Sequence, residues 1–173
     1  MIIVEADVDS LWEGPTDWRG IADEAARAAV RFSHQASLAD AGLDVEISVK
    51  FTSDDVVQAL NAGYRNKNRP TNVLSFPMIE PDLLESIAAA EGSEILLGDV
   101  VLAHDVCVRE AAEKGIGIDQ HAAHLVVHGV LHLLGYDHEQ GEDKAEAMEK
   151  VEREALASIG IADPYTATEV QTQ

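Results

Sequence analysis

Residues 120–135 constrain the fold more than any other stretch, because they read as a helix that is apolar on nearly every side. Charged residues are absent from this stretch, and its apolar positions do not keep to one face of a helix. They are Leu125, Val126, Val127, Val130, Leu131, Leu133 and Leu134. A helix of this kind has to be buried at the centre of a domain. We therefore expect the other elements to pack around it.

The same helix carries histidines at a spacing that suits a metal ion. His128 and His132 are four residues apart, so their rings lie one turn apart on one helix face. Gly135 is a typical helix stop, after which the chain can fold back and bring in His138. Three histidine ligands that leave a fourth position for water are typical of a catalytic zinc site. The alternative, ordinary core or surface histidines, explains a single histidine better than this repeated pattern.

Gly129 is the one departure from the long zincin motif, which carries a glutamate general base at this position. Without that base a metallopeptidase is disfavoured. A glycine inside a helix costs ~1 kcal/mol relative to alanine. We expect either that something approaches the backbone beside the metal or that a neighbouring element packs closely there. His124, one turn before His128, is expected to be capped or semi-exposed, with support of a metal ligand as the alternative.

Length and composition predict one domain, which we place at residues 1–165, followed by a frayed tail at 166–173. The chain has 173 residues, of which 46% are hydrophobic. Its one cysteine, Cys107, rules out an internal disulfide and fits a reducing compartment, where a small buried residue is expected. The sequence starts without a basic leader and has no apolar run of ~20 residues. We therefore expect a cytoplasmic protein without a membrane partner.

The formal net charge of −20 disfavours a DNA or RNA partner bound by simple charge attraction. The acids are unevenly distributed, however, and residues 56–79 and 120–136 contain none. The first of these stretches holds Arg65, Lys67 and Arg69, three of only twelve lysines and arginines. Two explanations remain open. These segments form a face that accepts an anion, or they are partly buried and exclude acids for that reason.

Periodicity and turn signals predict interleaved strands and helices. Asp17, Ser53 and Asp119 have the side chains expected at helix N-caps, and Gly98 suggests a bulge or a close backbone approach. Residues 61–72 are expected to form turns, and 80–92 a surface excursion. The predicted strands are 1–6, 45–49, 73–76 and 96–102, and the predicted helices are 17–41, a segment after Ser53, 106–114, a segment after Asp119, and 142–159. The fold class is therefore α/β (α+β), with a small mixed sheet and helices packed around the histidine-bearing helix.

Three further stretches, together with the histidine motif, resemble one known family. They are Asn61-x2-Tyr64-Arg65-x-Lys67-x2-Pro70-Thr71-Asn72-Val73-Leu74-Ser75-Phe76-Pro77, Leu96-Leu97-Gly98-Asp99-Val100 and Asp163-Pro164-Tyr165. With these motifs, the chain resembles the YbeY family of endoribonucleases that process ribosomal RNA. The resemblance runs from about Leu60 to Tyr165. Asn68 departs from it, because the family often carries an acid there, and this makes the segment more basic.

The resemblance implies a zincin-like fold and one zinc ion held by His128, His132 and His138. It implies that Arg65 serves activity on RNA, and that the enzyme cleaves single-stranded RNA in 3′-end maturation of small-subunit ribosomal RNA and in ribosome quality control. The expected partners are ribosomal RNA and ribosomal or ribosome-associated proteins. Because the chain is so acidic, we expect weak intrinsic affinity for RNA and delivery of the substrate by a partner.

The general base is not evident from the sequence. Asp137 adjoins His138 and is a candidate to orient a ligand or take a proton, although a turn residue bonded to its own backbone explains it equally well. Two other functions are weighed against the nuclease. One is a metal-stabilised adaptor that binds ribosome-associated proteins without turnover, and the less favoured one is a metallopeptidase.

Overall fold

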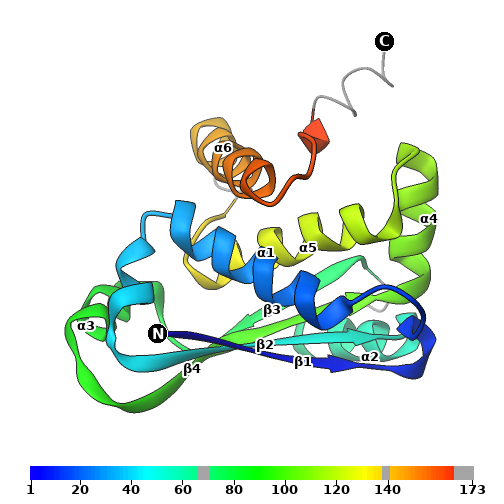
Figure 1. Cartoon of the computed structure of the whole chain (residues 1–173). Helices are drawn as coiled ribbons and strands as arrows, with labels where there is room; N and C mark the ends of the chain where they lie inside the picture. The colour runs from blue at the N-terminus through cyan, green and yellow to red at the C-terminus, as the bar shows by residue number, and fades with distance from the viewer. Residues whose placement is uncertain (66–70, 138–140, 166–173) are drawn as a thin grey trace.

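A four-stranded mixed sheet forms the base of the structure (Figure 1). The computed structural model describes residues 1–65, 71–137 and 141–165. Within them the strand order is β1-β2-β4-β3, where β1, β2 and β4 are parallel and β3 joins the edge antiparallel to β4. The strands are β1 (Ile2–Val8), β2 (Gly42–Thr52), β3 (Val73–Pro77) and β4 (Glu91–Ala103). The predicted mixed sheet and α+β class are confirmed.

Helices cover both faces of this sheet, and the two sides of β4 show how. Val100 and Leu102 belong to the large core under α1 and α5, whereas Val101 and Ala103 belong to a smaller cluster with Val57 of α2. Since successive strand residues point to opposite faces, α2 lies across the sheet from α5. The helices are α1 (Trp18–Phe32), α2 (Asp54–Arg65), α3 (Leu84–Ala89), α4 (His104–Lys114), α5 (Ile118–Leu133) and α6 (Glu142–Ser158), with short 3-10 turns η1 (Ser10–Trp12), η2 (Ala36–Asp40) and η3 (Pro81–Leu83).

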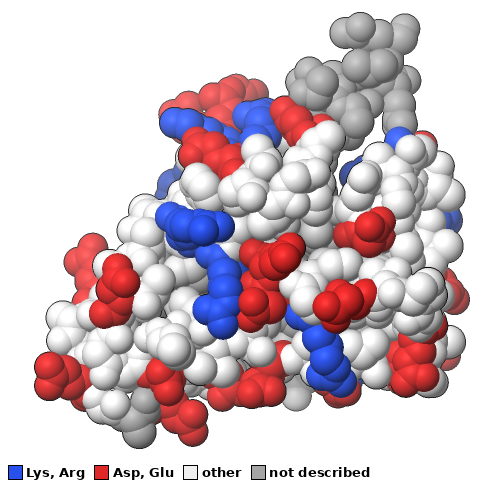
Figure 2. Space-filling model, in the orientation of Figure 1, with Lys and Arg blue, Asp and Glu red and all other residues white. Residues whose placement is uncertain are grey.

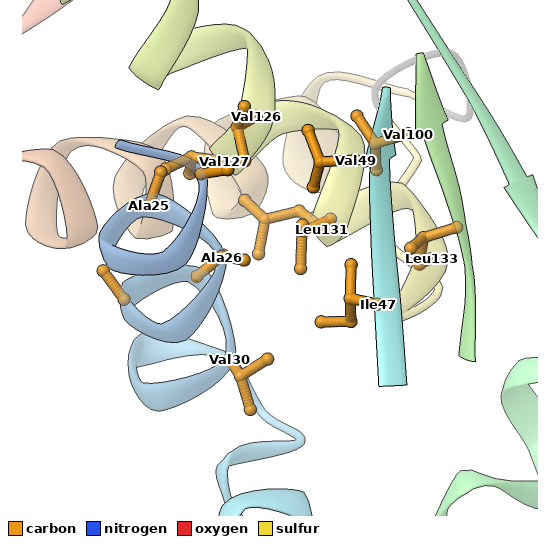
Figure 3. Close-up of a cluster of buried hydrophobic side chains, with 14 of the residues drawn as sticks. Ala25, Ala26, Val30, Ile47, Val49, Val100, Val126, Val127, Leu131 and Leu133 are labelled. Atoms are coloured by element: carbon orange, nitrogen blue, oxygen red, sulfur yellow. The ribbon is translucent and has the colours of Figure 1, made fainter. Parts of the chain in front are cut away.

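The histidine-bearing helix α5 is buried between the sheet and the other helices, as predicted. In Figure 3 the side chains of α1 and α5 meet those of the sheet in one continuous apolar cluster. Val126, Val127 and Leu131 of α5 have no exposed surface there. Helix α6 packs on the outer side of α1 and α5 (Figure 1). Within the described residues, no helix combines the length and apolar character needed to cross a membrane.

Helix α1 ends nine residues before the predicted end at Ala41. Asp17 caps its start, as predicted, and its carboxylate accepts a hydrogen bond from the Gly20 amide at 3.0 Å. At the other end Ser33 adopts an extended conformation, and its hydroxyl donates to the Val30 carbonyl at 2.7 Å. This bond satisfies a carbonyl of the last turn and stops the helix. The following residues form η2, which buries Leu38 completely.

Two other predicted boundaries are wrong, the start of α5 and the end of α2. Gly117, in an extended conformation, is the N-cap of α5, and Asp119 lies inside the first turn, where a carboxylate favours the positive end of the helix dipole. The predicted turn at 61–72 begins as helix, because α2 continues to Arg65 and buries Asn61. Residues 66–70 lie outside the described residues. The excursion at 80–92 contains η3 and α3 and is anchored by a fully buried Leu84.

Ser53 and Gly98 behave as the sequence predicts. The Ser53 hydroxyl accepts a hydrogen bond from the Val56 amide at 3.2 Å at the start of α2. At Gly98 the register of β4 against β2 shifts by one residue, and a side chain there would meet the Phe76 carbonyl at 2.6 Å and Leu133 at 2.7 Å. The bulge therefore lets the edge strand and α5 approach β4 closely.

Helix α4 buries the one cysteine of the chain. Cys107 has no exposed surface, and burial, together with the nearby Glu110 carboxylate, raises the pKa of its thiol to about 12. The thiol is therefore uncharged and acts as a small apolar side chain of the core, as predicted.

Gly129 is explained by the packing of α5 on the sheet. A Cβ atom at this position would lie 2.6 Å from Cγ1 of Val100 and 3.4 Å from Cγ2 of Val73. Of the two explanations offered by the sequence, the close approach of a neighbouring element is therefore the one observed. The position that carries a glutamate in zincin peptidases here faces strands β3 and β4.

We predict that Gly129→Ala destabilises the protein by about 1–3 kcal/mol, because the added methyl group overpacks the helix–sheet contact by more than the gain in helix propensity. Gly63→Ala is the matched control, since a Cβ atom at Gly63 of α2 meets nothing within 4 Å. The control should be neutral or stabilising by up to ~1 kcal/mol. Urea denaturation of both variants checks this, and equal stability of the two would contradict the packing explanation.

Candidate metal centre

His128 and His132 bring their ring nitrogens together at the end of α5. Their Nε2 atoms lie 3.1 Å apart, and the ring centroids are separated by 4.6 Å. The His128 side chain keeps 23% of its surface exposed, whereas most of α5 is buried. The two rings thus lie together on one face of α5, as the four-residue spacing predicts.

The other nitrogen of each ring is held by an acceptor. His128 Nδ1 lies 2.6 Å from Oε1 of Glu152, and His132 Nδ1 lies 2.8 Å from the backbone carbonyl of Tyr136. An ionised carboxylate and a carbonyl only accept hydrogen bonds, so each Nδ1 carries the proton and donates it. In the neutral form of the two rings, both Nε2 atoms are then acceptors that face each other.

Two lone pairs at this separation repel, and a cation between them removes the repulsion. A tetrahedral zinc ion with Zn–N bonds of ~2.0–2.1 Å separates two ligand nitrogens by ~3.3 Å. The observed 3.1 Å between the Nε2 atoms is close to this value. The chemistry and the spacing of His128 and His132 thus fit one zinc ion.

Glu152 belongs to the candidate centre, although it was not predicted from the sequence. Its side chain has no exposed surface, and its second oxygen, Oε2, accepts from Nε2 of His124 at 3.1 Å and from the hydroxyl of Tyr165. Burial by itself would raise the pKa of this carboxyl, but the hydrogen bonds from His124 and His128 outweigh burial and lower the pKa far below its ordinary value. The group is an anion that fixes two imidazoles.

A signal for Glu152 is present in the sequence. The buried face of α6 contains Met148, Ala155 and Leu156, and Glu152 lies one turn after the first of them. An acid in the middle of an apolar stripe is unusual unless it has partners. Because α6 also carries many exposed acids, Glu152 is hard to distinguish from them in the sequence.

His124 has the supporting position that was the less favoured of its two interpretations. It is buried rather than semi-exposed, and it shares Glu152 with His128. Burial lowers the pKa of its imidazole, so the ring is neutral and donates through Nε2. A carboxylate that receives a hydrogen bond from a metal-ligating histidine orients the ring and raises its basicity.

The chain reverses direction after α5 as the sequence predicts. Gly135 has a positive φ of 100°, and the Tyr136 amide donates back to the Leu131 carbonyl at 3.0 Å. This turn brings the Tyr136 carbonyl to His132 and is followed by a half-buried Asp137. Among the described residues no three His, Cys, Asp or Glu side chains form a metal-binding group. His138 lies outside the described residues, so its role as third ligand stays a prediction, and so does the role of Asp137.

Arg65 is the last residue of α2, on the opposite face of the sheet from α5. Its side chain is not described, and its predicted role toward RNA remains a prediction. Asn72, immediately before β3, is firmly held. Its side-chain amide donates to Oε1 of Glu110 at 3.1 Å, and its carbonyl accepts from the Ala103 amide at 3.0 Å.

A second carboxylate–histidine pair, Glu110 and His121, holds Asn72 in place. Oε1 of Glu110 on α4 lies 2.8 Å from Nε2 of His121, whose side chain on α5 is only 1% exposed. Burial raises the pKa of Glu110, but the hydrogen bonds from His121 and Asn72 outweigh it, and the net result is a lowered pKa. Asn72 is thereby linked through Glu110 to α5, the helix that carries His128 and His132.

A family model described as Endoribonuclease YbeY matches residues 16–160. The chain belongs to the Endoribonuclease YbeY family. The resemblance drawn from the sequence motifs is confirmed.

Relatives in this family match nearly the whole chain. Endoribonuclease YbeY of Rhizorhabdus wittichii is 53% identical over 169 residues, which cover 98% of this chain and 99% of the relative. Endoribonuclease YbeY of Novosphingobium aromaticivorans is 52% identical over 163 residues, covering 94% and 95%. The solution structure of a Thermotoga maritima protein matches with a TM-score of 0.53 at 24% identity over 91% of each chain, which supports the fold alone.

We predict that Glu110 contributes stability that depends on pH. Because its pKa is lower in the folded state, the contribution is fully present above the unfolded value of ~4.3 and is lost as pH falls through the folded value. Glu110→Gln should therefore be less stable than the original protein near pH 6, with the difference shrinking steadily toward pH 3.

Urea denaturation of the metal-free proteins between pH 3 and pH 6 measures this difference. Glu113→Gln, an exposed position on the same helix, should stay within about 0.5 kcal/mol of the original protein throughout. A Glu110→Gln difference that does not change with pH would show that the carboxylate is not stabilised by its partners.

Proposed function

We propose that this chain is a metal-dependent endoribonuclease that cleaves single-stranded RNA. The observation that carries the proposal is the geometry of His128 and His132, whose Nε2 atoms lie 3.1 Å apart while both Nδ1 atoms are held by acceptors, in a chain that belongs to the Endoribonuclease YbeY family. We further propose one zinc ion bound by His128, His132 and His138. The proposed role is 3′-end maturation of small-subunit ribosomal RNA and ribosome quality control, in the cytoplasm.

The residues around the centre have separate tasks in this proposal. His128 and His132 bind the ion, while Glu152 and the Tyr136 carbonyl keep the rings oriented through Nδ1. Zinc, when bound, supplies Lewis acidity toward a phosphate oxygen or a water molecule. Arg65 supplies a planar, permanently charged donor to the phosphate as negative charge develops on it. Asp137 is the proposed group to orient a ligand or take a proton.

RNA also brings a nucleophile of its own, the 2′-hydroxyl next to the scissile phosphate. For this reason the reaction does not require the glutamate base of the peptidases. That base has no room here, because a side chain at Gly129 would run into Val100 and Val73 of the sheet. The packing of α5 thus favours the nuclease over a metallopeptidase.

The surface charge bears on how the substrate arrives. Figure 2 shows acidic side chains spread over the face that carries α1 and β1, with a few basic ones among them. With a net charge of −20, the chain repels RNA at long range. We therefore propose that ribosomal or ribosome-associated proteins deliver the RNA. The same acidity supports the second candidate, an adaptor that binds such proteins without turnover.

We predict that cleavage of a small-subunit ribosomal RNA precursor fragment requires both His128 and the metal. Purified original protein and His128→Ala would be compared with and without a chelator, and the RNA products separated on a gel. We expect the original protein to cleave the RNA and His128→Ala not to cleave it. Chelator should abolish the cleavage, and added zinc should restore it.

The same assay with whole ribosomal particles separates the nuclease from the adaptor. If cleavage appears only with particles and still needs His128, a partner delivers the RNA. Binding to particles without cleavage under any condition would reject the nuclease and favour the adaptor. Cleavage of an unstructured peptide that is lost on chelation would instead favour the peptidase.

We predict that Arg65→Ala lowers the rate of RNA cleavage by about 10²–10³-fold, because a donor to the developing phosphate charge is lost. Zinc content, measured by atomic absorption, should not change, since Arg65 belongs to α2 and is not one of the proposed ligands. Arg109→Ala, in an exposed pair with Glu113 on α4, is the matched control and should cleave normally. Unchanged cleavage by Arg65→Ala would remove the role proposed for it.

A further inference from the structure

The segment Asp163–Tyr165 has no role in the function proposed so far, although it contacts the metal centre from outside. After α6 the chain runs back above α5 (Figure 1). The hydroxyl of Tyr165 donates to Oε2 of Glu152, and its ring lies edge-on to His124 with centroids 5.7 Å apart. Tyr165 therefore contacts Glu152, which holds the His128 ring, and His124, which shares that carboxylate.

The segment is held in this position by contacts of its own. Asp163 accepts a hydrogen bond from the Tyr165 amide at 2.8 Å through Oδ1, and its Oδ2 lies 3.2 Å from Nε of Arg153. The Arg153 guanidinium also lies over the Tyr165 ring, 5.4 Å from the centroid. Arg153 is the neighbour of Glu152 on α6. The same turn of that helix therefore contacts both the ring and the hydroxyl of Tyr165.

The hydroxyl completes the hydrogen bonding of a buried anion. Oε1 of Glu152 accepts from Nδ1 of His128, and Oε2 accepts from both His124 and Tyr165. Without the hydroxyl, the bond from His124 at 3.1 Å is the one that Oε2 keeps among the described residues, and it is longer than the 2.6 Å bond from His128 to Oε1. Loss of the hydroxyl leaves part of this buried carboxylate unsatisfied and weakens the network of hydrogen bonds that holds it against His128.

We propose that Tyr165 is a positioning residue of the metal centre, whose hydroxyl fixes the Glu152 carboxylate and through it the His128 ring, so that the Asp163–Tyr165 segment sets how tightly the centre binds zinc. This inference rests on the zinc site of the proposed function. It assigns the Asp-Pro-Tyr motif a task in metal affinity rather than in contact with RNA. Groups that orient metal-ligating histidines change metal affinity by ~10–100-fold when they are lost.

The experiment is a measurement of zinc affinity by competition with a chelating indicator, on the full-length protein. Tyr165→Phe removes the hydroxyl and keeps the ring between Arg153 and His124. We expect its dissociation constant for zinc to rise by about 10-fold, and that of Glu152→Gln by up to about 100-fold. Tyr64→Phe removes a hydroxyl from an exposed tyrosine on α2 and should bind zinc like the original protein.

A second readout does not involve the metal. In the zinc-free protein, nitrogen NMR shifts report which ring nitrogen of His128 carries the proton. The original protein should show the Nδ1–H form, and Tyr165→Phe should show a larger fraction of the Nε2–H form. Circular dichroism confirms that each variant is folded before its affinity is compared.

The outcomes separate the two levels of the proposal. If the original protein binds zinc and Tyr165→Phe binds it equally well with the same His128 tautomer, Tyr165 merely fills space and the inference is overturned. If the original protein binds no zinc, the proposed metal centre fails, and the inference fails with it. Zinc binding that weakens in Tyr165→Phe supports the inference even if the RNA cleavage assay is negative.

Discussion

A carboxylate without exposed surface, that of Glu152, connects the packing of this protein to its chemistry. An unpaired charge in such a place is strongly destabilising, so α6 has to lie where His124, His128 and Tyr165 can reach it. The contact therefore fixes the register of α6 against α5. It also decides which nitrogen of His128 faces outward. Stability of the helix pair and the ring orientation that the proposed metal centre needs are two results of one interaction.

The close contact between α5 and the sheet has a comparable double effect. Gly129 and the bulge at Gly98 let the helix sit near β4 and β3, which buries the apolar residues of α5. Because the sheet lies so close, no side chain fits at Gly129, the position that carries the glutamate base in zincin peptidases. The fold thus restricts the chemistry at this centre before any substrate is considered.

Sequence periodicity was sufficient for the elements whose signal is local. The buried helix, the strand at Val73 and the turn at Gly135 follow from side chains within one or two turns of each other. The early end of α1 at Phe32 depends on a hydroxyl–carbonyl bond that periodicity does not describe. Glu152 was missed because its meaning lies in histidines 24 and 28 residues away in sequence, which only the packing of α6 on α5 brings to it.

The buried Cys107 has a practical consequence for work on this protein. Thiol reagents attack the thiolate, and with a pKa of about 12 and no exposed surface this side chain offers almost none at neutral pH. It is also the one cysteine of the chain. A cysteine introduced on the surface is therefore the single reactive thiol of the folded molecule, and fluorescent or spin labels can be attached at a chosen position without first removing the natural one.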